Sequence, residues 1–195
     1  MKEDASNKPS ILRQVVRGVL IASAIGASAV LILSFLAECR PNKHVTNPTL
    51  TDIQALARAV EGFENQYDKL PDVSLLDFEM EGSEAVKLIT VLLGKEEEGQ
   101  GNIQNPRQIA FLTGRMTKHR KQGGIIFRSD YEADGIYDSW GNPLRIILRS
   151  PGQSTLVVPH LGKQVTTSKP AVVLSRGPDQ KWGTEDDIIS RTDGP

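Results

Sequence analysis

The segment that decides the fold begins with Asp138-Ser139-Trp140-Gly141-Asn142-Pro143 and ends with Gly177-Pro178-Asp179 and Gly183-Thr184-Glu185-Asp186-Asp187-Ile188. Both ends combine acidic residues with glycine or proline. These residues favour tight turns, because glycine tolerates a positive φ, proline fixes φ, and aspartate bonds to the nearby backbone. The segment therefore predicts chain reversals at both ends, with carboxylates held on the turns.

Short strand patterns lie between these turns. In residues 144–149 every second residue is Leu or Ile, and this alternation predicts a strand with one buried face. Pro151-Gly152 predicts a turn, after which residues 154–158 are expected to return as the partner of that strand. The continuous apolar run Ala171-Val172-Val173-Leu174 predicts a more central strand.

Upstream of the strands the sequence has helical periodicity. Asn47 and Pro48 predict a helix start, because asparagine caps helices and proline is favoured at the first helical position. The apolar positions that follow are three or four residues apart and form one face: Ile53, Leu56, Ala57, Val60, Phe63 and Tyr67. Leu70-Pro71 is expected to close this segment.

A second helix is predicted over residues 84–93, with Ser83 as its N-cap and Gly94 as its stop. The apolar residues 109–112 follow Asn105-Pro106, and their pattern leaves helix and strand open. Helices followed by antiparallel strands are typical of the α+β class. We therefore expect an amphipathic helix packed on a small antiparallel sheet.

Residues 18–37 contain no charged side chain and are rich in Ile, Leu, Val and Ala. At about 1.5 Å per residue, a helix over this range spans the roughly 30 Å hydrocarbon core of a bilayer, so an N-terminal transmembrane helix is predicted. Basic residues are more frequent before this segment than after it. The positive-inside rule then places residues 1–17 in the cytoplasm as a tail. Residues 38–47 become a linker and residues 48–195 a domain outside the cytoplasm.

Two other interpretations compete with a retained membrane anchor. A cleaved signal peptide usually has an apolar region of about 7 to 15 residues, and Phe35 with Ala37 makes a poor cleavage site. A lipoprotein would be modified at Cys39, but Glu38 stands where a small residue is expected. We favour the retained anchor, and lipidation of Cys39 stays open.

The overall charge gives no indication of a nucleic-acid partner, since 23 basic side chains balance 24 acidic ones. One basic cluster is present: Arg115, Lys118, His119, Arg120 and Lys121. No aromatic side chains alternate with these residues to stack on bases. A solvated loop is therefore favoured over a patch that binds a polyanion.

The sequence gives no support to an enzymatic function. It contains no G-x-S-x-G, H-E-x-x-H or P-loop motif. Cys39 is the only cysteine, which excludes an intrachain disulfide and a zinc site built on cysteines. We therefore predict that the protein is not an enzyme, and we identify no small-molecule substrate.

Three features together carry a resemblance to a known family. The first is a helix whose exit reads Tyr67-Asp68-Lys69-Leu70-Pro71, and the second is the D-x-W-G-N-P motif at residues 138–143. The third is Gly177-Pro178-Asp179 with the closing Asp187-Ile188. In this order and spacing they resemble the type IV pilins and the pseudopilins of bacterial type II secretion, and the C-terminal half is similar to the major pseudopilin.

The resemblance implies a pilin-like fold and a structural or assembly subunit of a type II secretion or type IV pilus-related system. Such a subunit is anchored in the bacterial inner membrane by a single span, with its N-terminus in the cytoplasm and its C-terminal domain in the periplasm. The implied partners are the membrane and other pilin-like or secretion-system subunits, in a role in protein transport.

The N-terminal region departs from the family pattern. Members have a leader ending in glycine and a glutamate five residues later, whereas Gly18 is followed at that place by Ser23. Residues 41 and 48 are prolines and interrupt what is one continuous helix in the family. These departures keep a second interpretation open, a membrane-tethered extracytoplasmic binding domain with a pilin-like fold and no filament role.

The resemblance also implies a calcium ion in the C-terminal loop. Asp179 and Asp187 match the acidic ligands of the family's loop, and Asp186 is a possible third oxygen donor. Calcium takes six to eight oxygen ligands from flexible loops of this kind. Gln180 replaces the second glycine of the motif, and a plain turn without metal is the alternative.

A second acidic stretch imitates the first half of an EF-hand loop: Asp130, Glu132, Asp134 and Gly135. The twelfth position of such a loop supplies a bidentate carboxylate, and here it is Gly141. We therefore predict a polar turn at this place, with no bound metal.

Overall fold

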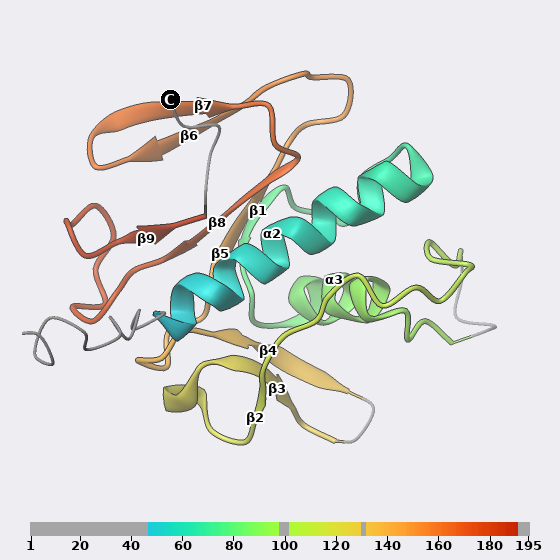
Figure 1. Cartoon of the computed structure of the whole chain (residues 1–195), viewed down its shortest axis with the longest axis horizontal. Coiled ribbons are helices and arrows are strands. Elements are labelled where there is room, and N and C mark those ends of the chain that lie inside the picture. The colour runs from blue at the N-terminus through green and yellow to red at the C-terminus, as the bar shows by residue number, and fades with distance from the viewer. Residues whose placement is uncertain (1–46, 98–101, 130–131, 191–195) are drawn as a thin grey trace, which may run out of the picture. The chain divides into compact units, whose positions relative to one another are not determined.

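The computed structural model describes residues 47–97, 102–129 and 132–190, which belong to one compact unit, Thr46–Pro195 (Figure 1). Its helices are α2 (Pro48–Tyr67), α3 (Ser83–Leu93) and the short 3-10 helix η1 (Arg120–Gln122). Its strands are β1 (Asp77–Glu79), β2 (Met116–Thr117), β3 (Gly124–Phe127), β4 (Ala133–Tyr137), β5 (Arg145–Leu148), β6 (Leu156–His160), β7 (Lys163–Thr167), β8 (Ala171–Ser175) and β9 (Ile188–Ile189).

The strands form three sheets. The largest has the order β1-β5-β8-β9 and is antiparallel throughout. The second has the order β2-β3-β4, in which β2 and β3 run parallel and β3 and β4 antiparallel. The third is the antiparallel hairpin β6-β7. The hairpin leaves the plane of the four-stranded sheet, as Figure 1 shows above β8.

Helix α2 begins where the sequence predicts it. The Asn47 side chain accepts a hydrogen bond from the Thr49 amide at 3.1 Å, and Pro48 occupies the first helical position. The helix ends at Tyr67, because Asp68 adopts a left-handed conformation with φ of 54° and its amide bonds back to Glu64. These caps fix the length of the helix that contacts β8.

The main core lies between the two α-helices and the inner faces of the sheets. It is built from α2 (Ile53, Leu56, Ala59, Val60, Phe63), α3 (Ala85, Leu88, Ile89, Leu92), the four-stranded sheet (Ile146, Leu148, Ala171, Val173) and the three-stranded sheet (Ile125, Ala133, Ile136). Helices packed on one face of a sheet bury its apolar side chains in this way.

A second core covers the opposite face of the four-stranded sheet. Successive side chains of a strand point to opposite faces, so Ile147, Val172 and Leu174 turn away from α2. Leu156 and Val158 of β6 pack on them, with Trp182 and Ile189 at the margin. Strands β5 and β8 are therefore buried on both faces, which explains the continuous apolar run of β8.

The predicted fold class was wrong in its sheet arrangement. A single small antiparallel sheet was expected, but the described residues form three sheets, one of them with a parallel pair. Residues 154–158 were expected to pair with residues 144–149. Instead β6 pairs with β7, and β5 lies between β1 and β8. Strands of two or three residues, such as β1, β2 and β9, are too short for a periodic pattern to show.

The membrane part of the predicted fold is not tested by the residues that the structure describes. The predicted tail, transmembrane helix at residues 18–37 and linker lie outside the described residues, apart from Asn47. Among the residues that the structure describes, no helix is long and apolar enough to cross a bilayer. The predicted helices over residues 47–70 and 84–93 correspond to α2 and α3, although Ser83 is the first helical residue and Gly82 the N-cap.

Candidate functional site: the joined turns at residues 138–142 and 175–187

The centre of the candidate site is the carboxylate of Asp138, which is fully buried. Its Oδ1 accepts hydrogen bonds from the Trp140 and Asn142 amides, both at 2.9 Å. Its Oδ2 accepts from the Asn142 side-chain amide at 2.9 Å and from the Ser175 hydroxyl at 2.7 Å. Four donors therefore compensate the cost of burying this charge.

Asn142 joins the D-x-W-G-N-P turn to the turn that follows β8. Its Nδ2 donates both to Asp138 and to the Gly177 carbonyl at 3.1 Å. The Gly177 amide in turn donates to the Ser175 hydroxyl oxygen at 3.1 Å. The two turns that the sequence singles out, more than thirty residues apart, thus form one hydrogen-bonded unit.

The joined turns are also attached to the start of α2. Thr49, which is fully buried, donates its hydroxyl to the Ser139 Oγ at 3.0 Å and accepts from the Ser139 amide at 3.0 Å. Figure 1 shows the start of α2 beside this region of the domain. The point where the chain enters α2 is therefore fixed to the D-x-W-G-N-P turn.

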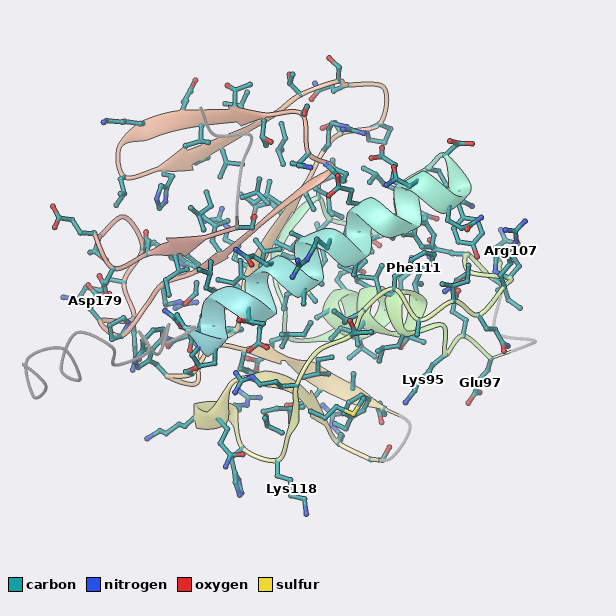
Figure 2. The ribbon with its side chains drawn as sticks, viewed as in Figure 1. Lys95, Glu97, Arg107, Phe111, Lys118 and Asp179 are labelled. Carbon is teal, nitrogen blue, oxygen red and sulfur yellow. The ribbon has the colours of Figure 1, made fainter. Side chains whose placement is uncertain are left out.

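The predicted calcium ligands lie together on the loop between β8 and β9, where Figure 2 labels Asp179. Asp186 accepts from the Asp179 amide at 3.1 Å and from the Thr184 hydroxyl at 2.6 Å. Asp187 accepts from the Gly183 amide at 2.7 Å through Oδ2. Asp179 accepts from the Lys181 amide at 2.9 Å. The three carboxylates brace the loop from within.

Two backbone positions let this loop close on itself. Gly177 has a φ of 62°, and a Cβ atom there would lie only 2.3 Å from the Asp186 carbonyl oxygen, so no larger residue fits. Gln180 has a φ of 62° as well. That conformation is unfavourable for a residue with a Cβ atom. The loop thus adopts a glycine-type turn at a residue that is not glycine.

The fit of this loop to a calcium ion rests on one atom. Among the described residues no group of three or more Asp, Glu, His or Cys side chains converges as metal ligands. The Oδ1 atom of Asp187, however, is buried and has no hydrogen-bond partner. A buried oxygen without a donor is costly, and a cation would compensate it. The hydrogen bonds from Thr184 and from the Asp179 amide also hold the pKa of Asp186 below its usual range, so this carboxyl is ionised at neutral pH.

The acidic stretch that imitates an EF-hand is a polar surface cluster, so far as the structure describes it. Asp134 accepts from Arg120 at 3.2 Å, from Arg128 at 3.1 Å and from the Tyr137 hydroxyl at 3.2 Å. Asp130 lies outside the described residues. The carboxylate of Asp134 is thus committed to cationic side chains, as a polar turn requires.

This cluster predicts a pH dependence of stability. Burial raises the pKa of Asp134, but the hydrogen bonds from Arg128, Arg120 and Tyr137 outweigh it, and the pKa is lowered. Because the pKa of Asp134 is lower in the folded state than in the unfolded state, its ionised form stabilises the fold. This stabilisation is fully present above the unfolded pKa of about 3.9, and it is lost as the pH falls through the folded-state pKa. Asp134→Asn should therefore cost about 1 kcal/mol at pH 7, because the arginines are largely exposed. Urea unfolding should show the difference from wild type shrinking below about pH 4; a constant difference would contradict the assignment.

A cationic and aromatic cluster on the outer face of the four-stranded sheet was not predicted. Trp182 lies against the guanidinium groups of Arg145 and Arg176, at 5.6 and 5.1 Å from its ring centroid. Arg145 pairs with Asp77 at 2.7 Å, and Arg176 pairs with Glu79. Asp77 and Glu79 flank Phe78 in β1, and the pairing of β1 with β5 brings Arg145 beside them.

The basic cluster of the sequence is divided by the fold. Arg115 forms a two-point ion pair with the buried Asp52, at 2.6 Å for the closer contact. Arg120 pairs with Glu81 and Asp134. Lys118 and Lys121 are exposed, and Figure 2 shows Lys118 projecting away from the domain. Two of the five residues therefore have structural partners of opposite charge.

Comparison of the chain with protein-family models, with curated proteins and with solved structures finds no match. The functional conclusion therefore rests on the sequence motifs and on the geometry of the joined turns.

Proposed function

We propose that the protein is a pseudopilin-like structural or assembly subunit of a bacterial type II secretion or type IV pilus-related system. The observation that carries the proposal is Asn142, which joins the two motif-bearing turns by donating to both Asp138 and Gly177. Two of the three motifs on which the resemblance rests are thus joined in the tertiary structure. The polar side chains of Asp138, Asn142 and Ser175 bond to one another and to the backbone of the turns. This arrangement is typical of residues that stabilise a fold.

The proposed location is the bacterial inner membrane, with residues 48–195 in the periplasm. The support is the uncharged apolar stretch of residues 18–37 and the excess of basic residues before it. Partners would be the membrane and other subunits of the same assembly. We propose no enzymatic activity, because the buried carboxylate of Asp138 has all its acceptor positions directed to structural donors.

A reporter enzyme that is active only outside the cytoplasm tests this location. Fused after residue 195, it should be active, and the same reporter fused before residue 1 should be silent. The reverse pattern, or activity at neither end with both fusions expressed, would refute the proposed orientation.

We further propose that the loop between β8 and β9 binds calcium, held by Asp179, Asp186 and Asp187. The ion would neutralise the carboxylates and supply the partner that the buried Asp187 Oδ1 lacks. A fragment of residues 46–195, which contains both cores, should then melt about 5 °C higher at a hundredfold excess of calcium over its Kd.

Single variants test the ligands. Asp187→Ala should abolish the calcium-dependent shift. It should leave the melting temperature in EDTA within about 2 °C of wild type, since the loss of the hydrogen bond from the Gly183 amide is offset by the removal of a buried oxygen that has no donor. Asp134→Ala is the matched control, because it removes an acidic side chain outside the loop and should keep the calcium shift. A melting curve that calcium leaves unchanged would show that the loop is a turn only.

A second candidate function is that of a membrane-anchored domain that does not assemble with other subunits. Ser23 at the family's glutamate position and the prolines at residues 41 and 48 favour it. The protein would then be a tethered extracytoplasmic binding domain. Assembly with other subunits distinguishes the two functions.

A further inference from the structure

The segment from β2 through η1 carries exposed basic and apolar side chains together. Residues 116–122, named here the basic loop, begin in β2 with Met116, which is 65% exposed. Lys118, His119 and Lys121 follow and are all exposed. Within residues 47–97, 102–129 and 132–190, no ion pair involves Lys118 or Lys121. The loop thus presents an apolar side chain beside uncompensated positive charge.

The basic loop lies next to the point at which the chain enters α2. A Cβ atom on Gly141 would lie 3.3 Å from the Lys121 side chain, and one on Gly123 would lie 3.0 Å from the Asp138 backbone. The same turn is bonded to Thr49 through Ser139. Figure 1 shows η1 on the side of the domain where α2 begins. The start of α2 and the basic loop are therefore both in contact with the D-x-W-G-N-P turn.

We propose that the basic loop docks on the anionic headgroups of a membrane surface, with Lys118 and Lys121 at the phosphates and Met116 reaching toward the acyl boundary. Basic residues attract anionic lipids, and an apolar side chain among them adds burial at the interface. This inference rests on the proposed membrane location. The docked loop would orient the domain on the membrane, in addition to the attachment through the proposed anchor at residues 18–37.

The alternative occupants fit the loop less well. Nucleic acid binding uses aromatic side chains on which bases stack, and the loop has none. The planar guanidinium groups in and beside the loop are already paired. Arg115, which precedes the loop, binds Asp52, and Arg120 binds Glu81. The remaining lysines are flexible point charges, which suit a fluid array of headgroups.

Fluorescence quenching in vesicles tests the docking with the full chain. A fluorophore is attached at Gln122→Cys in a Cys39→Ser background, and the protein is reconstituted into brominated phosphatidylcholine with or without phosphatidylglycerol. We expect stronger quenching with the anionic lipid. Lys118→Gln/Lys121→Gln should lower the docked-to-undocked ratio about thirtyfold, since each lysine near the surface contributes about fivefold. The control Lys69→Gln/Lys163→Gln removes two exposed charges elsewhere and should leave the quenching unchanged.

The outcomes separate this inference from the proposed function. A chain that floats with the vesicles but shows no dependence on phosphatidylglycerol, or none on Lys118 and Lys121, refutes the docking alone. Lysine-dependent binding of a soluble oligonucleotide without any such quenching makes the loop a polyanion site and refutes the membrane contact. A chain that floats with neither vesicle contradicts the docking and the membrane location together.

Discussion

Asp138→Ala is expected to lower the free energy of unfolding by about 4 kcal/mol. The substitution leaves the Trp140 and Asn142 amides, the Asn142 side chain and the Ser175 hydroxyl without their common acceptor. It also releases the turn that holds the start of α2. For a domain of this size the melting temperature should fall by about 8 °C.

Asp179→Ala is the matched control, because it removes an aspartate from the neighbouring loop. Its carboxylate is exposed and accepts from the Lys181 amide, so in EDTA the loss should stay below about 1 kcal/mol. Both variants are compared by urea unfolding of residues 46–195. Equal, small losses in the two variants would contradict the structural role of Asp138.

Asn105→Ala is expected to lower the free energy of unfolding by about 3 kcal/mol, because it also leaves buried hydrogen-bonding groups without partners. Asn105 is fully buried and accepts from the Tyr67 hydroxyl at 2.7 Å and from the Ile109 amide at 3.1 Å. It donates to the Val91 and Ile109 carbonyls at 2.9 and 2.8 Å. One side chain thus connects the end of α2, the end of α3 and the irregular segment after them.

The neighbouring variants separate these contributions. Tyr67→Phe removes one of the four bonds and should cost about 1 kcal/mol. Asn105→Asp should be at least as harmful as alanine, because it places a carboxylate oxygen against two carbonyls. Arg107→Ala, on the exposed side of the same segment (Figure 2), should have almost no effect. An Asn105→Ala protein as stable as Arg107→Ala would refute the account.

The helices could be predicted because their signals are local. Asn47 and Pro48 define the start of α2 through contacts within one turn, and Gly94 ends α3 with a φ of 66°. The inner position of β8 was also predicted, since a strand buried on both faces has a continuous apolar sequence. Local propensity and periodicity are enough for elements of this kind.

Strand pairing could not be predicted, because it is decided by contacts between distant residues. The sequence places a turn at Pro151-Gly152, yet β6 turns away from β5 and pairs with β7. The reason is visible only in the folded domain, where Leu156 and Val158 cover the outer face of the large sheet. The three-residue β1 pairs with β5 across about seventy residues, for which the sequence has no signal.

The candidate site was predicted in part. The sequence places carboxylates on both turns, but it does not show that Asp138 is buried or that Ser175 and Thr49 complete its surroundings. Those hydroxyl residues are common in any strand or helix start, and only tertiary contacts give them a role. The proposed calcium ligands stay a prediction, supported by the unpartnered Oδ1 of Asp187.

Chemical crosslinking of intact membranes tests the proposed assembly function most directly. The full chain, expressed in its host and treated with an amine-reactive crosslinker, should be recovered in larger covalent species that contain further copies of the chain or other membrane subunits. Asp138→Ala should reduce these species more than Asp179→Ala does. Recovery of the wild-type chain only as a monomer, while an established membrane complex in the same sample crosslinks, would contradict a subunit role and favour a tethered binding domain.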